Sequence, residues 1–225
     1  MKRCPLRPAL PLLVCLLALP ACEKPPPEEA RLSAEARAAL ERGDLAQARS
    51  LAEAAVDALA RPTDQVSEPR GEALYVLGMI ADREGDVNRA GTLLTQSVRF
   101  APKLLPAWVK LAGIQRGLGA DDEAVLSYEQ AVWMDPHNAD YRAALCWAHV
   151  DLKHDEPMIA SCAAAAAEGP QHAAALGGYA AALIRAGREG EAAAPLAALN
   201  ALAPADRDPV LADVERARAG ERTGR

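Results

Sequence analysis

The chain of 225 residues carries 25 basic and 31 acidic side chains and has a formal charge of −6. No basic stripe or aromatic-rich basic segment is present, and a protein that neutralises phosphates needs one, so the sequence argues against nucleic-acid binding. With only one Phe, four Tyr and three Trp among 51% hydrophobic residues, the core must consist of Ala and Leu in close-packed helix pairs. No strands are expected.

The amino-terminal residues have the pattern of a bacterial export signal. Lys2 and Arg3 make a basic start, and Ala9 to Ala21 form an uncharged apolar run of 13 residues. The run is interrupted by prolines and is shorter than the ~20 residues that a membrane-spanning helix needs. We therefore predict a signal peptide over residues 1–21 and no transmembrane anchor.

The residues before Cys22 indicate where this signal is cleaved. Leu19, Pro20, Ala21 and Cys22 resemble the lipobox of bacterial lipoproteins, although proline is unusual at the second place. The resemblance implies a lipid-modified Cys22 and an anchor in a membrane of the bacterial cell envelope. Because Glu23 is not the aspartate of inner-membrane retention, the outer membrane, facing the periplasm, is favoured. Cleavage would remove three basic side chains and no acidic one, which lowers the formal charge from −6 to −9.

Residues 22–30 are predicted to form a tether. Three consecutive prolines, Pro25 to Pro27, stand among charged residues. This composition is typical of a stiff, solvated spacer without a fold of its own. It would hold the rest of the chain away from the membrane.

A fixed period dominates the remaining sequence. Pro102, Pro136, Pro170 and Pro204 stand 34 residues apart without an insertion. A period of this length indicates a solenoid, because one supersecondary unit cannot bury its apolar face alone and must stack on a neighbour.

Each period contains two amphipathic helices. Between Leu74 and Ala81 the apolar and small residues recur at helical spacing, a Gly85-Asp86 turn follows, and a second such stripe begins at Ala90. Pro102 cannot continue the second helix, so it ends the unit. The unit is therefore a helical hairpin.

At these positions the sequence resembles the tetratricopeptide repeat. Residues 105–138 match its pattern at Trp108, Leu111, Ala112, Gln115, Gly119, Ala124, Tyr128, Ala131 and Pro136. The resemblance implies an all-α, right-handed superhelical solenoid of about five helical hairpins with a carboxyl-terminal capping helix. The predicted units cover residues 31–62 (degenerate), 71–104, 105–138, 139–172 and 173–206, with a loop over 63–70 and the capping helix over 207–220.

Prolines outside the period predict local irregularities. Pro157 indicates a delayed second helix in the fourth unit, and Pro195 indicates a kink or a late start in the fifth. Asp208 and Pro209 supply the start of the capping helix. The tail after Gly220 is expected to fray.

In this family the first helix of each unit lines a concave groove, and its second, fifth, ninth, twelfth and thirteenth places contact ligands. A mixed set of arginines and aromatics at these places suits an extended or helical segment of another protein, with Arg as a carboxylate clamp and Trp147 as the best aromatic anchor. By phase, the large or charged occupants are Arg37, Tyr75, Met79, Asp82, Arg83, Val109, Arg116, Trp147, Val150, Asp151, Ile184 and Arg185.

Two cysteines remain beside Cys22 after processing. Cys146 and Cys162 fall at places that face the inside of the fourth hairpin, so they form either a disulfide in an oxidising periplasm or two buried free thiols. His149 and His154 lie near Cys146, but no second Cys-x-x-Cys or His-x-x-His arm accompanies them. No metal site is expected.

No catalytic motif is present: the chain lacks a nucleophile elbow, a phosphate-binding glycine loop and a His-Glu-x-x-His pair. We expect no enzyme activity, no cofactor and no small-molecule substrate. The layout resembles lipoproteins that help assemble pilus secretins or outer-membrane proteins, so we expect a noncatalytic scaffold that binds another protein in such an assembly. Two alternatives stay open, a soluble periplasmic chaperone and a regulator of cell-wall enzymes.

Overall fold

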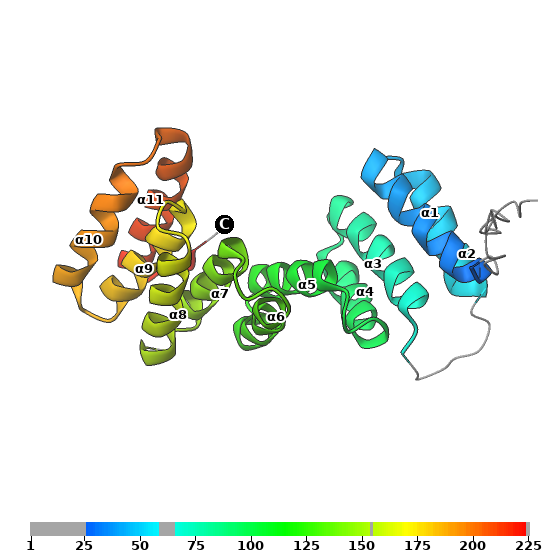
Figure 1. Ribbon diagram of the computed structural model, residues 1–225, viewed down its shortest axis with the longest axis horizontal. Coiled ribbons are helices and arrows are strands. Elements are labelled where there is room, and N and C mark those ends of the chain that lie inside the picture. Colours follow the sequence, from blue (N-terminus) through cyan, green and yellow to red (C-terminus); the bar gives the residue numbers. More distant parts are fainter. Residues whose placement is uncertain (1–25, 59–65, 154, 224–225) are drawn as a thin grey trace, which may run out of the picture.

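The computed structural model describes residues 26–58, 66–153 and 155–223, and within these ranges every regular secondary-structure element is an α-helix, as Figure 1 shows. The predicted signal peptide and Cys22 lie outside the described residues. The helices are α1 (Glu28–Arg42), α2 (Leu45–Ala58), α3 (Glu68–Arg83), α4 (Val87–Phe100), α5 (Leu105–Leu118), α6 (Asp121–Met134), α7 (Ala139–Leu152), α8 (Asp155–Glu168), α9 (Ala173–Arg185), α10 (Glu189–Asn200) and α11 (Pro204–Arg218).

Successive helices pack as antiparallel hairpins that stack into an elongated solenoid (Figure 1). Each first helix contacts its own second helix, and each second helix contacts the first helix of the next pair. After the fifth pair, α11 packs against α9 and covers it. The predicted fold, a solenoid of about five hairpins with a capping helix, is confirmed.

Left-handed backbone at one residue closes each hairpin. Gly43, Gly85, Gly119 and Gly187 end the first helices with φ values of 82°, 81°, 82° and 71°. Glycine adopts this conformation without a steric penalty. In the fourth pair Lys153 takes the same place at φ 63°, the one non-glycine residue with positive φ among the described residues.

Small residues let the helices approach closely. Ala90 and Leu94 of α4 are completely buried, and they pack in one cluster with Ala107 and Leu111 of α5. The interior is therefore built from Ala and Leu across the boundary between units, as the composition predicts. Neighbouring hairpins share their cores, which is what makes a solenoid stable as a whole.

Neither proline outside the period delays the start of its helix. Helix α8 begins at Asp155, one period after the start of α6 at Asp121, so the predicted delay at Pro157 is wrong. A proline in the first turn removes no intrahelical hydrogen bond, because the first four N–H groups of a helix have no intrahelical acceptor. Helix α10 also starts in phase, at Glu189, with Pro195 inside it, so the late start is wrong and the kink stays a prediction.

Element boundaries shift at both ends of the repeats. Helix α1 begins at Glu28, inside the predicted tether, and α3 begins at Glu68, inside the predicted loop. The capping helix starts at Pro204 rather than at Asp208, and Pro209 lies within it. Proline is well accommodated at the first position of a helix, so the residue that closes the period also opens α11.

The tail after α11 is ordered as far as the structure describes it. The chain turns at Gly220 with φ 76° and comes back toward α5 and α7, where Thr223 is 3% exposed. The predicted fraying is wrong for residues 220–223, which we call the return segment. Among the described helices, none is long and apolar enough to cross a membrane.

Candidate partner-binding groove

The amino-terminal part of the predicted groove presents side chains that remain accessible. Tyr75 and Met79 of α3 are half-buried against the cluster formed by α1, α2 and α3, and Arg83 is exposed. Burial raises the pKa of the Tyr75 hydroxyl, although the nearby Arg37 and Arg83 guanidinium groups oppose this shift. Tyr75, Met79 and Arg83 are spaced at i, i+4 and i+8, so they form one stripe along α3.

Several predicted ligand-binding charges instead pair with the next first helix. Such pairs join α1 to α3, α3 to α5 and α5 to α7. The basic side chain belongs to the earlier helix in the first and third pairs and to the later helix in the second. The pairs are Arg37–Glu72 at 3.7 Å, Lys110–Asp82 at 2.5 Å and Arg116–Asp151 at 2.7 Å. The first two are partly solvated and contribute only about 0–1 kcal/mol each.

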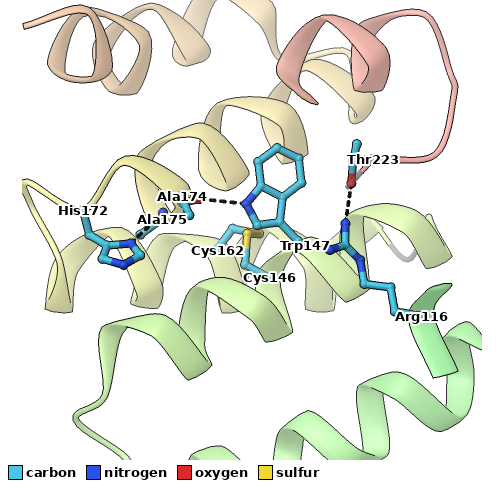
Figure 2. The surroundings of a disulfide bond; sticks show 8 residues. All are labelled: Arg116, Cys146, Trp147, Cys162, His172, Ala174, Ala175 and Thr223. Atoms are coloured by element: carbon cyan, nitrogen blue, oxygen red, sulfur yellow. Dashed lines mark hydrogen bonds between the residues drawn. A yellow bond between two sulfur atoms is a disulfide. The ribbon is translucent and has the colours of Figure 1, made fainter. Parts of the chain in front are cut away.

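The carboxyl-terminal part of the predicted groove is covered. Trp147 is 6% exposed and its indole nitrogen donates to the carbonyl of Ala174, 2.9 Å away, as Figure 2 shows. Val150, Asp151 and Ile184 are buried as well. The prediction that Trp147 is an accessible anchor is wrong, because α9 packs over this face of α7. Val109 of α5 is half-buried.

Three predicted groove residues bind the return segment. The Arg116 guanidinium donates to the hydroxyl of Thr223 over 2.6 Å (Figure 2). The carboxylate of Asp151 accepts from the Thr223 backbone N–H at 2.8 Å and from the Thr223 hydroxyl at 3.0 Å. Arg185 of α9 donates to the carbonyl of Glu221. Burial lowers the pKa of Arg185, and the Asp151 carboxylate opposes this shift.

Arg222 adds a fourth anchor to the return segment. Its guanidinium binds both carboxylate oxygens of Asp121, the first residue of α6, and also donates to the Arg116 carbonyl. The hydrogen bond to Asp121 is the main reason that the pKa of Arg222 is raised. A bidentate Arg–carboxylate pair gives both energy and direction to a contact. The return segment is therefore held by residues of α5, α6, α7 and α9.

Behind this surface a disulfide joins the fourth hairpin. Cys146 of α7 and Cys162 of α8 are bonded to each other, with their Cα atoms 4.7 Å apart (Figure 2). Both cysteines are completely buried. His149 is buried on the same helix, and His154 lies outside the described residues. No cluster of three or more possible metal ligands occurs within the described part of the chain.

Comparison with known proteins assigns the family. A family model described as a tetratricopeptide repeat matches residues 70–212. The chain belongs to the tetratricopeptide-repeat family. The match runs from the first turn of α3 through α10 into α11, whereas α1 and α2 lie before it. None of the curated proteins compared with the chain matches it.

Solved tetratricopeptide-repeat proteins share the fold. MamA AMB-1 is 22% identical over 77% of this chain and 91% of its own, with a TM-score of 0.64. MamA from Desulfovibrio magneticus RS-1 is 18% identical over 76% of this chain and 93% of its own, with a TM-score of 0.62. YrrB, a tetratricopeptide-repeat protein with an unusual peptide-binding site, is 14% identical over 84% of this chain and 89% of its own, with a TM-score of 0.66. At these identities the likeness shows the fold alone.

Sequence reasoning missed five residues of this surface: Glu72, Lys110, Asp121, Arg222 and Thr223. Glu72 stands at the second place of its tetratricopeptide unit, so phase alone could have found it. Lys110 and Asp121 occupy none of the family's ligand-contacting places. Arg222 and Thr223 follow the last periodic element, and no signal in the sequence indicates that they fold back.

Proposed function

We propose that the protein is a noncatalytic scaffold that binds an extended or helical segment of another protein along the first helices of its amino-terminal units. The observation that carries this proposal is the stripe of Tyr75, Met79 and Arg83 on α3. It combines half-buried apolar area with an exposed cation. Aromatic and Arg side chains contribute most to protein–protein contacts when a partner covers them.

The comparisons support peptide binding as the mode of action. YrrB has the same fold and a peptide-binding site, and its likeness extends over most of both chains. A solenoid of helix pairs presents a long surface that suits extended or helical ligands. We extend this mode to the present chain because its α3 stripe is accessible, whereas Trp147 and Ile184 are buried.

We further propose that the protein acts in the bacterial cell envelope, anchored through a lipid on Cys22 and facing the periplasm. The lipobox-like residues Leu19 to Cys22 support this placement. The Cys146–Cys162 disulfide supports it independently, since structural disulfides persist in oxidising compartments. In this setting the partner belongs to an envelope assembly of the pilus, secretin or outer-membrane-protein kind. The alternatives are a soluble periplasmic chaperone and a regulator of cell-wall enzymes.

Crosslinking of the full chain in whole bacterial cells tests these proposals. Mass spectrometry would identify the amino-terminal peptide and the captured proteins. An acylated Cys22 with one dominant envelope partner supports the assembly scaffold. A free amino terminus with many unrelated captives supports the soluble chaperone instead, and one tight partner from the cell-wall machinery supports the regulator.

Matched arginine variants locate the binding surface. Arg83→Glu reverses an exposed charge on the α3 stripe, and Arg89→Glu reverses an exposed charge on α4 of the same unit. Both changes should leave helicity intact because both side chains are exposed. We expect capture of the partner to fall with Arg83→Glu and to persist with Arg89→Glu. Equal capture by both variants would remove the α3 stripe from the proposal.

A further inference from the structure

The return segment occupies part of the predicted groove in the way a bound peptide would. It is not helical, and it meets polar side chains from three successive first helices, Arg116 of α5, Asp151 of α7 and Arg185 of α9. Two of these three contacts reach its main chain. A groove that binds an extended segment uses the same combination, with side chains holding the backbone and a few pockets selecting residues.

We infer that Arg116, Asp121, Asp151 and Arg185 form a recognition site for a non-helical segment in which Arg is followed by Thr or Ser, and that the chain's own Arg222-Thr223 fills this site until a partner segment of the same chemistry replaces it. The inference rests on the proposed function and adds to it the chemistry of the partner. It places this second binding site apart from the α3 stripe.

Burial explains why the site selects a hydroxyl residue. The side chain of Asp151 is completely buried, and the side chain of Arg116 is 18% exposed. A buried carboxylate is costly unless hydrogen-bond donors surround it. The Thr223 backbone N–H and hydroxyl supply two of these donors, and Arg116 supplies a third. A Val in place of Thr would keep the shape of the side chain but would remove the hydroxyl.

Charge explains why the residue before it is Arg. Asp121 receives the Arg222 guanidinium on both of its carboxylate oxygens. Asp121 is also the first residue of α6, and its own side chain is 14% exposed. Lys cannot make this bidentate contact. The site therefore distinguishes Arg from Lys as well as from neutral residues.

The covalent connection to α11 makes the return segment a strong competitor of a free partner segment. Only Ala219 and Gly220 separate α11 from Glu221, so the segment is presented at an effective concentration of the order of millimolar. A free segment that binds the empty site with a Kd of ~10 μM would then bind the occupied site about 100-fold more weakly. Release of the return segment is thus a condition for binding of a partner there.

A peptide-binding measurement on the full chain tests the inference. The probe is a fluorescent peptide, Gly-Glu-Arg-Thr-Gly, blocked at both ends, and its fluorescence anisotropy reports binding. The variant Arg222→Gln/Thr223→Val disables the chain's own segment. Arg207→Gln is the matched control, since Arg207 lies near the start of α11, where it pairs with Asp208 and donates to the Asn200 carbonyl. We expect the double variant to bind the probe at least ~10-fold more tightly than the unaltered chain and the control. A probe in which Gln replaces Arg and Val replaces Thr should not bind.

A charge exchange keeps the test decisive if the double variant is destabilised. Asp121→Arg should abolish binding of the Arg-containing probe in the double-variant background, and Gly-Glu-Glu-Thr-Gly should then bind. A merely structural return segment would lower stability in the double variant without any gain in probe binding, and that result overturns the inference. If probe binding fails while Arg83→Glu still reduces partner capture, the inference is wrong and the proposed function stands. A concentration-dependent dimer that Arg222→Gln abolishes would overturn binding of the segment within one chain.

Discussion

Gly178 of α9 lies so close to Cys146 of α7 that a Cβ atom at Gly178 would be 2.5 Å from the cysteine sulfur. The same Cβ would lie 3.3 Å from the indole nitrogen of Trp147. Absence of a side chain at this point lets α9 pack directly over the disulfide and over the tryptophan. The covered part of the predicted groove depends on this contact.

Gly178→Ala should therefore destabilise the protein even though alanine favours helices. Overpacking in a core costs about 1–3 kcal/mol, whereas the gain in helix propensity is about 1 kcal/mol. We expect a net loss of up to about 2 kcal/mol, measured by urea unfolding followed with circular dichroism. Gly190→Ala on α10 is the matched control because nothing lies within 4 Å of its Cβ position. The control should be neutral or slightly stabilising, and equal effects of the two changes would contradict the close packing at Gly178.

Reduction of the Cys146–Cys162 disulfide should lower the stability of the unaltered chain. The bond closes a loop with a sequence separation of 16, for which the loss of chain entropy corresponds to about 3 kcal/mol. Unfolding in urea with and without dithiothreitol measures the effect. The double variant Cys146→Ala/Cys162→Ala should be less stable than the oxidised chain and insensitive to dithiothreitol. Sensitivity of the double variant would assign the effect to another cysteine.

The periodic part of the fold was predictable because each repeat imposes its helix boundaries on the next. The starts at Asp121, Asp155 and Glu189 follow the 34-residue period, and the prolines at 157 and 195 do not displace them. Packing outweighs the tendency of these prolines to interrupt a helix, because a displaced helix would expose the apolar face that its neighbours cover. Phase thus predicts an element better than a single disruptive residue does.

The candidate site was predictable only in part, because phase gives the face of a helix and not what covers that face. Tyr75 and Trp147 both belong to the predicted groove, yet α9 buries Trp147, whereas Tyr75 is only half-buried. Pairing of Asp151 with Thr223 joins residues separated by 72 positions, and Thr223 stands beyond the last repeat. Contacts made by a nonperiodic segment leave no trace in a periodic pattern.

Trp147→Phe should destabilise the protein, whereas Trp133→Phe should not. Trp147 is 6% exposed and its indole N–H donates to the Ala174 carbonyl, so Phe would lose this hydrogen bond and part of the buried packing. Loss of one such hydrogen bond costs about 0.5–1.5 kcal/mol. Trp133 of α6 is 78% exposed, so its replacement should change stability by less than about 0.5 kcal/mol.

Fluorescence gives an independent check of the same assignment. Removal of Trp133 should eliminate most of the emission that acrylamide quenches, and removal of Trp147 should eliminate blue-shifted emission that acrylamide does not reach. If Trp147 were quenched as easily as Trp133, it would be accessible to a partner and would return to the groove.

Pro209→Ala should stabilise the capping helix. Pro209 is exposed and lies inside α11, where it removes one backbone hydrogen bond, and proline in a helix interior is about 3 kcal/mol less favourable than alanine. Relief of part of this cost should raise the free energy of unfolding by about 1–3 kcal/mol, as measured in urea. Pro204→Ala is the control, because Pro204 is the first residue of α11 and its nitrogen needs no intrahelical acceptor. A gain for both variants alike would contradict the assignment to the missing hydrogen bond at Pro209, because replacement of proline makes the unfolded chain more flexible and by itself lowers stability.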